Sequence, residues 1–357
     1  MKLLSGNNKT IRAIGMMSGT SLDGLDIAAV EFKKTGEEWQ FELIDAATVP
    51  YSHEWEEQLK KAPQLSGEQL TKLDYEYGGY LGEQANAFIQ EQNFAADFIA
   101  SHGHTVFHRP EEGYTLQIGA GAKIAAVSGL PVVADFRTAD VAFGGQGAPL
   151  VPIGDKLLFS DYDYCLNLGG FANFSFEENG ERIAFDIGPA NIVLNEMVQE
   201  FGLKYDKDGE LGRQGKIDFN LLKQLNDLEF YRQQEPKSLG REWIEEVFLP
   251  LLAKSQASSL DKLRTVYEHI AIQITSVLNG KGKMLVTGGG AFNCFLIERI
   301  QNLTTTEVCL PGTKIIEYKE AIIFAFLGVL RVLEINNCLA SVTGASKDHS
   351  SGLIFQP

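Results

Sequence analysis

An apolar strand that runs straight into a turn of small polar residues opens each half of this chain. In the first half "IRAIGMM" leads into "SGTSLDG" and then "LDIAAVEF", at residues 11–32. In the second half "YDYCLNL" leads into "GGFAN" and then "FSFEENGERIAFDIGPAN", at residues 162–191. The alternation of apolar and polar residues on both sides of each turn predicts strands. Two similar openings therefore predict two related domains that face each other across a cleft.

Helical patterns alternate with strands along the rest of the chain. Residues 54–94 predict helices, one of them capped by Ser66, and residues 319–334 predict a last buried helix. "DFIASHG", at residues 97–103, is expected to be a short buried strand that runs into a polar loop. Interleaved strands and helices indicate an α/β fold with mixed sheets flanked by helices. Glycine and proline become frequent at residues 137–152, so the crossing between the domains is expected there.

Three glycine-containing turns suggest phosphate binding: "MSGTSLDG", "NLGGFAN" and "TGGGAFN". Glycine, serine and threonine let backbone N–H groups approach an anion, and hydroxyl groups add donors. One such turn is more often only a tight turn, but three turns that each end an apolar strand favour a nucleotide cleft. The sequence has no P-loop motif, no dinucleotide-binding fingerprint and no protein-kinase motif set. A bound ATP would therefore be held without a P-loop lysine.

Carboxylates follow the same strands, and phosphoryl transfer needs a metal to neutralise charge and a base near the attacking oxygen. Asp186 lies at the end of an apolar segment, where a cleft floor is expected, although a lone aspartate before Gly-Pro more often caps a turn. Arg137 is either a structural ion-pair partner or a fork for a substrate carboxylate. The other candidate carboxylates are Asp23, Asp26, Asp135, Asp140 and Glu320.

Three histidines stand within seven residues in "SHGHTVFH", namely His102, His104 and His108. Histidines two apart on one strand could supply two metal ligands on one face, so a histidine-based metallohydrolase is an alternative. No carboxylate motif accompanies them, and a hydrogen-bonding role at a sugar or structural site is favoured.

Charge and cysteine content exclude several classes of protein. The net charge of −16 argues against a nucleic-acid or anionic-membrane surface. The four cysteines are scattered, so neither a disulfide framework nor a cysteine zinc site is indicated. The N-terminus lacks the apolar core of a signal peptide, and the longest apolar run, residues 321–330, is too short to span a bilayer. A cytoplasmic protein is expected.

The motifs occur together, in the order found in anhydro-N-acetylmuramic acid kinases. The chain resembles that family from residue 11 to about residue 346, through "GMMSGTSLDGLDIA", "SHGHTVFH", "TLQIG", "VVADFRTADVAFGGQGAPLVP", "NLGGFANFSF", "FDIGPAN", "GGGAFNCFLIERI" and "KEAIIFAFLG". The resemblance implies two actin-like (ribonuclease H-like) domains around an ATP and sugar cleft. They are expected at residues 1–136 plus about 338–357, and at residues 137–337.

The resemblance also implies an activity. Family members use ATP and Mg²⁺ on 1,6-anhydro-N-acetylmuramic acid, open the anhydro ring with water and yield N-acetylmuramic acid 6-phosphate, for peptidoglycan recycling. Asp186 matches the catalytic aspartate, and the sugar-site positions are Arg137, Glu320 and His102. The implied ATP-binding residues are Gly19, Thr20, Ser21, Leu22, Asp23, Gly24, Leu25, Asp26, Gly169, Gly170, Gly288, Gly289, Gly290 and Asn293. Mg²⁺ would bind through the ATP phosphates, with Asp23 through water as one option, and a homodimer is implied.

The chain departs from the family pattern at five positions. His104 replaces a glutamine and Ala120 an acid, while Ile187 and Ala190 replace a hydroxyl residue and a glycine, and Asn195 an aspartate. These departures concern the sugar pocket and leave Asp186 in place. They motivate a second hypothesis, an actin-like ATP-binding sensor that has lost phosphoryl transfer.

Overall fold

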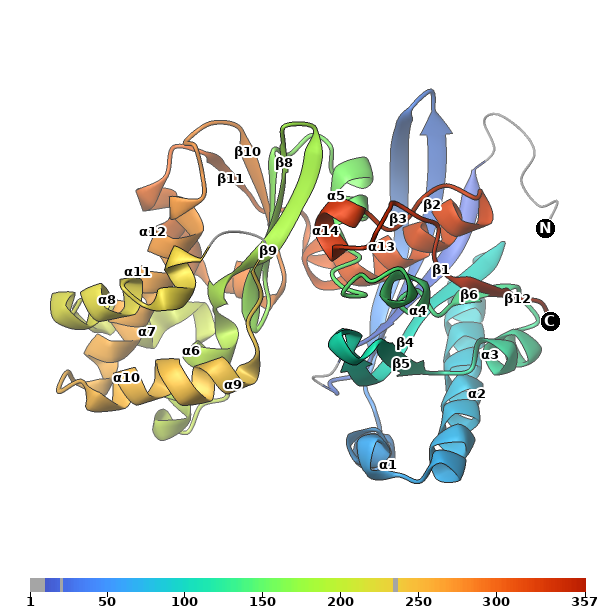
Figure 1. Ribbon diagram of the computed structural model, residues 1–357, viewed down its shortest axis with the longest axis horizontal. Helices are drawn as coiled ribbons and strands as arrows, with labels where there is room; N and C mark the ends of the chain where they lie inside the picture. The colour runs from blue at the N-terminus through green and yellow to red at the C-terminus, as the bar shows by residue number, and fades with distance from the viewer. Residues whose placement is uncertain (1–9, 20–21, 234–236) are drawn as a thin grey trace. The chain divides into compact units, whose positions relative to one another are not determined.

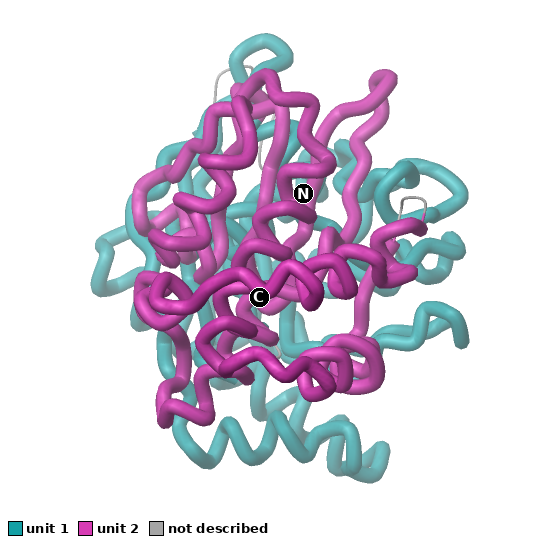
Figure 2. Tube along the Cα trace, turned by 90° about the vertical axis from the view of Figure 1, so that its left-hand side faces the viewer, with its two compact units in different colours: residues 1–159, 318–357 teal, residues 160–317 magenta. Residues whose placement is uncertain are grey.

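The computed structural model describes residues 10–19, 22–233 and 237–357, and the chain divides into two compact units (Figure 2). Unit 1 comprises Met1–Phe159 and Tyr318–Pro357, and unit 2 comprises Ser160–Glu317. Both ends of the chain therefore belong to the same unit. The interdomain cleft stays a prediction.

Within its described residues, unit 1 is built on a seven-stranded sheet in the order β12-β6-β4-β1-β2-β3, with β5 paired to β4 (Figure 1). β1 and β4 are parallel neighbours, as are β4 and β6, whereas β1, β2 and β3 pair antiparallel. The strands are β1 (Ile11–Ser18), β2 (Leu25–Thr35), β3 (Glu38–Val49), β4 (Phe98–Arg109), β5 (Tyr114–Ile118), β6 (Val132–Ala134) and β12 (Leu353–Phe355). The helices are α1 (His53–Lys61), α2 (Gly67–Glu91), α3 (Gly121–Ser128), α4 (Thr138–Ala142), α5 (Pro152–Leu158), most of α13 (Thr313–Val332) and α14 (Ala340–Thr343).

Unit 2 repeats the central part of this topology. Its described residues form a five-stranded sheet in the order β11-β10-β7-β8-β9, again with two parallel and two antiparallel pairings. The strands are β7 (Tyr164–Leu168), β8 (Phe171–Glu178), β9 (Glu181–Pro189), β10 (Lys283–Thr287) and β11 (Glu307–Cys309). The α-helices are α6 (Asn191–Val198), α7 (Glu210–Gln214), α8 (Phe219–Asn226), α9 (Arg241–Trp243), α10 (Leu249–Lys254), α11 (Ser259–Ser276) and α12 (Cys294–Leu303). The shared strand order and directions confirm the expected fold class of two ribonuclease H-like, mixed α/β domains.

Helices cover both faces of the unit 1 sheet, which explains why β1 is buried along most of its length. Ile14 and Met16 on one face pack into a core that includes Tyr77 of α2. Gly15 points to the other face, where a Cβ would lie 1.9 Å from the backbone oxygen of Ala321 in α13. A strand buried on both faces is continuously apolar rather than alternating, so the close approach of α13 requires a glycine here.

The domain boundaries differ from those expected from the sequence. Unit 1 continues to Phe159 because α5 packs near β3 and against α13, where Gly154 faces the Ile323 side chain. The chain returns to unit 1 at Tyr318, because α13 covers the N-terminal sheet and Gly328 packs against Phe98. The division therefore falls after Phe159 and before Tyr318, not at the edges of residues 137–337.

The prediction of a short strand followed by a loop at residues 97–103 is wrong for the loop, because β4 is longer than expected. It continues to Arg109, so the histidine cluster lies on a long strand and not in a polar loop. The left-handed φ of Gly103, +75°, and register shifts in the pairing with β1 and β5 break the regular alternation of its side chains. The helical expectations are confirmed, and Ser66 caps α2 through a complete capping box with Gln69.

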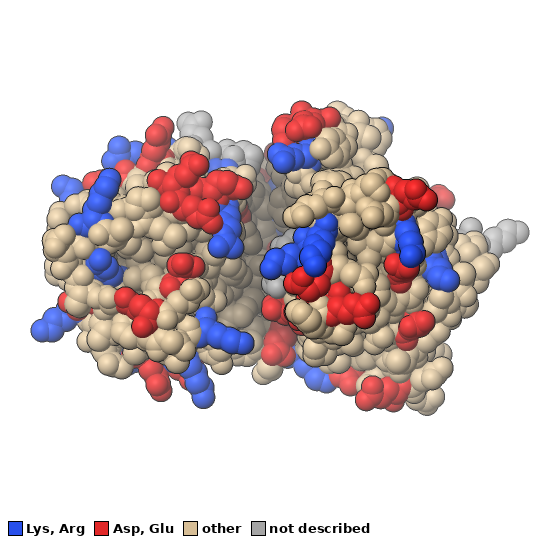
Figure 3. Space-filling model, turned by 90° about the horizontal axis from the view of Figure 1, so that it is seen from below, with Lys and Arg blue, Asp and Glu red and all other residues tan. Residues whose placement is uncertain are grey.

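The surface agrees with the acidic composition. On the face drawn in Figure 3, acidic side chains gather in clusters and basic ones are scattered among them. Among the described helices, none combines the length and the apolar character that crossing a bilayer demands.

Candidate active site

The turn after β1 opens the candidate site in unit 1. Of the residues assigned to ATP here, Thr20 and Ser21 lie outside the described residues. Leu22 has a left-handed φ of +61°, and its N–H lies 3.4 Å from the carbonyl oxygen of Gly19. A Cβ on Gly24 would lie 2.6 Å from the backbone oxygen of Val49, so the turn runs close against the end of β3.

The two aspartates of this turn have different surroundings. Asp23 is exposed, whereas Asp26 is half-buried at the start of β2. Asp26 accepts a hydrogen bond of 2.6 Å from the Thr48 hydroxyl on the neighbouring strand. Leu25, between them, is buried in the core. Oxygen ligands for a cation are thus available from one exposed and one hydrogen-bonded carboxylate.

A buried chain of hydroxyl groups anchors the end of β1. The Tyr51 hydroxyl donates to Ser18 Oγ at 2.8 Å and lies 2.6 Å from the Tyr77 hydroxyl. Ser18 Oγ in turn lies 3.1 Å from Nδ1 of His104. Burial lowers the pKa of His104 to about 4, so the ring is neutral at physiological pH, and it shares one proton with Ser18 in this hydrogen bond. The histidine that replaces the family's glutamine therefore supports the end of β1 through a hydrogen bond to Ser18.

Arg137 stands at the N-cap of α4 and is held from two sides. Its Nε donates to Nε2 of His102 at 2.9 Å, and a terminal nitrogen donates to the carbonyl oxygen of Gly147 at 3.0 Å. Arginine only donates, so His102 Nε2 accepts, and Nδ1 carries the proton that is donated to the Gly103 oxygen at 2.8 Å. Burial, with the nearby arginine, holds the pKa of His102 well below its usual range. Both nitrogens of His102 are thereby engaged within unit 1.

Glu320 lies in the same charged neighbourhood, on α13. Burial raises its pKa, and the positive charges of Arg137 and Lys319 oppose that rise, while the charge of Asp26 adds to it. Burial also lowers the pKa of Arg137 to about 10, and Glu320 opposes that shift. In unit 1, Glu320 therefore interacts electrostatically with both Arg137 and Asp26, two other residues predicted for the site.

A buried ion pair adjoins this charged group in unit 1. Lys319 Nζ lies 2.6 Å from Oδ1 of Asp155, and both side chains are almost inaccessible to solvent. Lys319 was not predicted to be a site residue. Its position next to Glu320 in "KEAIIFAFLG" was the available signal.

In unit 2, two parallel strands end in glycine turns at the same edge of the sheet. β7 ends before Gly169 and β10 before Gly288, and the register pairs Asn167 with Thr287. Gly288 has a φ of +80°, and a Cβ there would lie 2.4 Å from the side-chain oxygen of Asn167. Only glycine allows the two turns to approach this closely.

Gly170, Gly289 and Gly290 of these turns differ in what surrounds them. A Cβ on Gly290 would lie 2.7 Å from Leu168 Cβ, so this glycine serves packing between the turns. A Cβ on Gly170 or Gly289 would meet nothing nearer than 3.7 Å. Packing therefore does not require glycine at these two positions, which suits a backbone cradle for an anion.

Asn293 has a structural role in unit 2. Its side-chain oxygen caps α12 by accepting from the N–H of Leu296 at 3.0 Å, and its nitrogen donates to the Tyr267 hydroxyl at 2.7 Å. Because both side-chain atoms are engaged, Asn293 shapes the glycine turn rather than offering a free group.

Asp186 lies on β9, opposite Asn173 on β8. One carboxylate oxygen accepts from the Asn173 amide, and the other accepts from the N–H of Leu239 at 2.9 Å. Burial raises the pKa of Asp186, and these two donors oppose the rise. The result is a fixed carboxylate that is more basic than an exposed aspartate. Asn173 was missed as a site residue, although it stands inside the quoted motif "NLGGFANFSF".

Two of the departures from the family pattern lie in the hydrophobic core. Ile187 is the extra residue where β9 bulges against β8, and its side chain is only 4% exposed. Ala190 is fully buried, in the same core cluster. Their replacement of a hydroxyl residue and a glycine therefore changes packing. Ala120 at the start of α3 and Asn195 on α6 are half-buried.

The histidine cluster is not arranged as a metal site. His102 faces Arg137, His104 faces Ser18, and His108 Nδ1 lies 3.1 Å from the Thr115 hydroxyl. Among the described residues, the three rings do not converge on one point. The metallohydrolase alternative therefore loses its structural basis.

Comparison with known proteins gives a family. Residues 11–357 match the sequence model of the family described as anhydro-N-acetylmuramic acid kinase. A protein of that name from Mannheimia succiniciproducens is 35% identical over 375 residues, covering 96% of this chain and 98% of the relative. One from Vibrio cholerae is 35% identical over 372 residues, with the same coverage of 96% and 98%. Among solved structures, component A of (R)-2-hydroxyglutaryl-CoA dehydratase from Acidaminococcus fermentans is similar with a TM-score of 0.43 and 12% identity, over 88% of this chain and 96% of that one.

Proposed function

The chain belongs to the anhydro-N-acetylmuramic acid kinase family, and on that premise we propose that it phosphorylates 1,6-anhydro-N-acetylmuramic acid with ATP. Water opens the anhydro ring in the same reaction, and the product is N-acetylmuramic acid 6-phosphate, a step of cell-wall recycling. The observation that carries this proposal is the family match, which extends over residues 11–357 and leaves Asp186 in place.

Asp186 is the proposed general base. A water molecule attacks C1 of the sugar, its proton passes to the Asp186 carboxylate, and the electron pair of the C1–O6 bond moves to O6. O6 then attacks the γ-phosphorus of ATP, and ADP leaves. A base works best when its pKa approaches the operating pH, and burial moves the pKa of Asp186 in that direction. The amides of Asn173 and Leu239 hold the carboxylate for this task.

The charged group in unit 1 is the proposed sugar site. Muramic acid carries a carboxylate, which suits the planar fork of Arg137. Glu320, beside the arginine, would accept hydrogen bonds from sugar groups. His102 contributes indirectly, because its Nε2 fixes the Arg137 guanidinium.

ATP is proposed to lie against the glycine turns, with its phosphates near backbone N–H groups of residues 19–26, 169–170 and 288–290. Mg²⁺ prefers oxygen ligands and keeps several waters. Asp23 and Asp26 fit that preference, since they are carboxylates on the turn after β1 and at the start of β2, and Asp23 is exposed. Bound with ATP, Mg²⁺ would neutralise the charge on the transferred phosphoryl group.

One assay tests the proposal. Purified protein with ATP, Mg²⁺ and the anhydro sugar should form ADP and sugar 6-phosphate in equal amounts. Mass spectrometry and phosphorus NMR measure the two products. Labelled water should place one oxygen at C1. Tight ATP binding with no product from this or related amino sugars would reject the kinase and support the ATP-sensor alternative. ATP hydrolysis that does not depend on sugar would also reject it.

We further propose a cytoplasmic homodimer. The substrate and ATP would both be supplied in that compartment, and the family resemblance implies the dimer. Sedimentation equilibrium at micromolar concentration should give twice the chain mass of 39.3 kDa. A single-chain mass would contradict the dimer and leave the activity untouched.

A further inference from the structure

Three buried side chains with metal-binding atoms meet in unit 1, from separate places in the sequence. Asp140 lies on α4, Cys338 follows α13, and His349 precedes β12. Their exposed fractions are 0%, 2% and 6%. One carboxylate oxygen, the sulfur and one ring nitrogen all lie within 4.8 Å of one another. The proposed reaction uses none of the three.

The orientation of the His349 ring leaves its Nε2 without a hydrogen bond among the described residues. Nδ1 lies 3.1 Å from the carbonyl oxygen of Lys347, so Nδ1 carries a proton and Nε2 is the nitrogen available to a metal. Nε2 is buried and, among the described residues, has no hydrogen-bond partner. It faces Oδ1 of Asp140 at 3.6 Å, beyond hydrogen-bond distance. Two buried polar atoms that face each other without a hydrogen bond are unfavourable, and a metal ion bound between them would satisfy both.

The surroundings hold all three groups in place. Asp140 accepts from the Thr343 hydroxyl and from the Gly147 N–H, each at 2.7 Å. Cys338 and His349 form an antiparallel bridge, with N–H to oxygen distances of 3.1 and 3.2 Å. Metal-binding histidines commonly donate their second nitrogen to a carbonyl, and metal-binding carboxylates are themselves hydrogen-bonded. Both features are present before any metal binds.

We propose that Asp140, Cys338 and His349 form a Zn²⁺ site with a water molecule in the fourth position. One nitrogen, one sulfur and one oxygen ligand form a donor set that zinc accepts, whereas Mg²⁺ takes oxygen ligands. On binding, a zinc–sulfur bond forms and the thiol proton leaves to solvent. The thiolate and the carboxylate then balance the two positive charges.

The site would fasten the C-terminal segment to α4, directly after Arg137. The same two segments already share backbone hydrogen bonds, from Gln146 to Thr343 at 2.7 Å and from Ser346 to Phe143 at 3.0 Å. A metal that joins Asp140 to this segment would therefore have a structural role. No sequence motif reveals the site, because positions 140, 338 and 349 are far apart or irregularly spaced in the sequence.

The test uses the full chain, stripped with a chelator and titrated with Zn²⁺ and, separately, with Co²⁺. About one equivalent of either metal should bind, zinc should raise the melting temperature, and cobalt should give a near-ultraviolet thiolate charge-transfer band. Cys338→Ser and His349→Gln should lower zinc content to about a tenth or less and remove the band. The matched controls are Cys309→Ser, at a partly exposed thiol on β11, and His53→Gln, at an exposed ring on α1. Both should bind metal as the wild type does.

X-ray absorption on the zinc-loaded wild type keeps the test independent of whether the variants fold. One sulfur among nitrogen and oxygen neighbours is expected. An oxygen-only shell, no zinc uptake by the wild type, or a cobalt band that survives Cys338→Ser would overturn the site. Destabilisation of His349→Gln in metal-free protein, with no zinc uptake by the wild type, would show instead a direct ion pair between His349 and Asp140.

Discussion

At the scale of single residues, the clearest consequence concerns the base. Asp186→Asn keeps the size of the side chain and removes the proton acceptor. Turnover should fall by about 10²–10⁴-fold, the range for a lost general base. ATP should still raise the melting temperature of the variant, because the glycine turns are unchanged. Initial rates of sugar 6-phosphate formation and thermal shifts with ATP measure the two effects. Turnover within a few-fold of the wild type would remove Asp186 from the role.

His102 offers a second residue-scale prediction, because it acts through Arg137. His102→Leu removes the acceptor of the hydrogen bond that Arg137 Nε donates. The loss of a hydrogen bond from a charged group costs about 1.5–3 kcal/mol. The effect should be a rise of about tenfold or more in KM for the sugar. KM for ATP should stay unchanged.

The matched variant is His102→Gln, which keeps an acceptor near the same position and should restore most of the sugar affinity. Steady-state kinetics with each substrate varied in turn measure the split. An equal loss in KM for ATP, or no rescue by glutamine, would show that His102 only packs against its neighbours, such as the Phe324 ring at 4.7 Å.

At the scale of elements, β1 and α13 depend on one glycine. Gly15→Ala places a methyl group where a Cβ would lie 1.9 Å from the Ala321 oxygen, so the helix must move away from the sheet. We expect a loss of about 1–3 kcal/mol in the free energy of unfolding, as for overpacked cores. Gly67→Ala is the control, since this glycine in the first turn of α2 has open space around it. Urea denaturation should find that variant as stable as the wild type or more so.

Elements whose structure is decided by local chemistry were predicted correctly from the sequence. The alternation in residues 11–32 predicted β1 and β2, and Ser66 predicted the start of α2. Prediction failed where tertiary contacts decide. The polar segment after Gly103 was expected to be a loop, but β5 pairs with it and extends β4 to Arg109.

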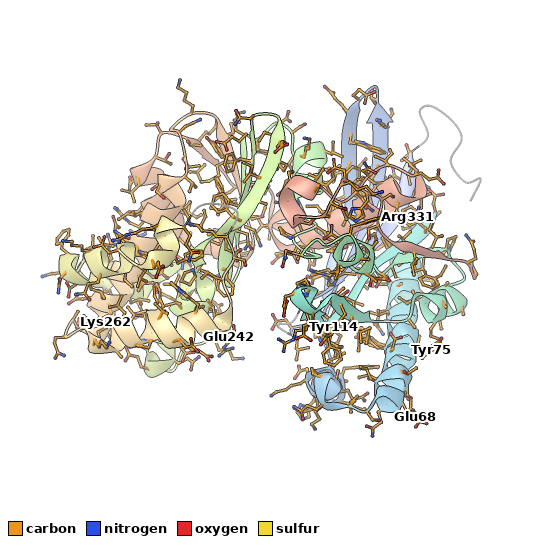
Figure 4. All side chains as sticks on the ribbon, in the orientation of Figure 1. Glu68, Tyr75, Tyr114, Glu242, Lys262 and Arg331 are labelled. Carbon is orange, nitrogen blue, oxygen red and sulfur yellow. The ribbon has the colours of Figure 1, made fainter. Side chains whose placement is uncertain are left out.

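The candidate site follows the same division. The glycine turns were found because their composition is local, and Asp186 was found through a resemblance. Asn173 was missed because only the β8–β9 register brings it to Asp186. The boundary at Tyr318 was missed because an apolar helix does not reveal in its sequence which sheet it will cover. Arg331 of α13, labelled in Figure 4, is an example of a contact between residues distant in sequence: its side chain donates to the Gly352 oxygen, 21 positions further along the chain, at 2.7 Å.

At the scale of the whole molecule, both units contain histidines that folding keeps neutral. His104 in unit 1 has its pKa lowered to about 4 by burial, and His269 in unit 2 to about 3. An unfolded histidine binds a proton near pH 6.5, so below that pH the unfolded chain holds more protons than the folded one. Each such histidine therefore contributes stability that is full above about pH 6.5 and is lost as the pH falls. The raised pKa values of Asp186 and Glu320 act in the opposite sense.

A comparison of one variant with the wild type isolates the histidine effect, because the carboxylates are common to both. His269 is 1% exposed, and its ring nitrogens lie 2.6 Å from the Asn226 oxygen and 2.8 Å from the Tyr231 hydroxyl. At pH 7, His269→Gln should lower the free energy of unfolding of unit 2, since it disturbs these bonds. Between about pH 6 and pH 4 the wild type should lose about 1.4 kcal/mol per pH unit relative to the variant. The two stability curves should therefore converge as the pH falls.

The fluorescence of Trp243 allows the stability of unit 2 to be measured by itself. Its ring centroid lies 6.4 Å from that of Tyr231, the hydrogen-bond partner of His269. The chain's other tryptophans, Trp39 and Trp55, lie in unit 1 and can be replaced by phenylalanine in both proteins compared. Urea denaturation followed by Trp243 fluorescence then reports one unit at each pH. A difference between wild type and variant that stays constant from pH 7 to pH 4 would mean that His269 titrates alike in the folded and unfolded chains, and that burial does not keep its ring neutral.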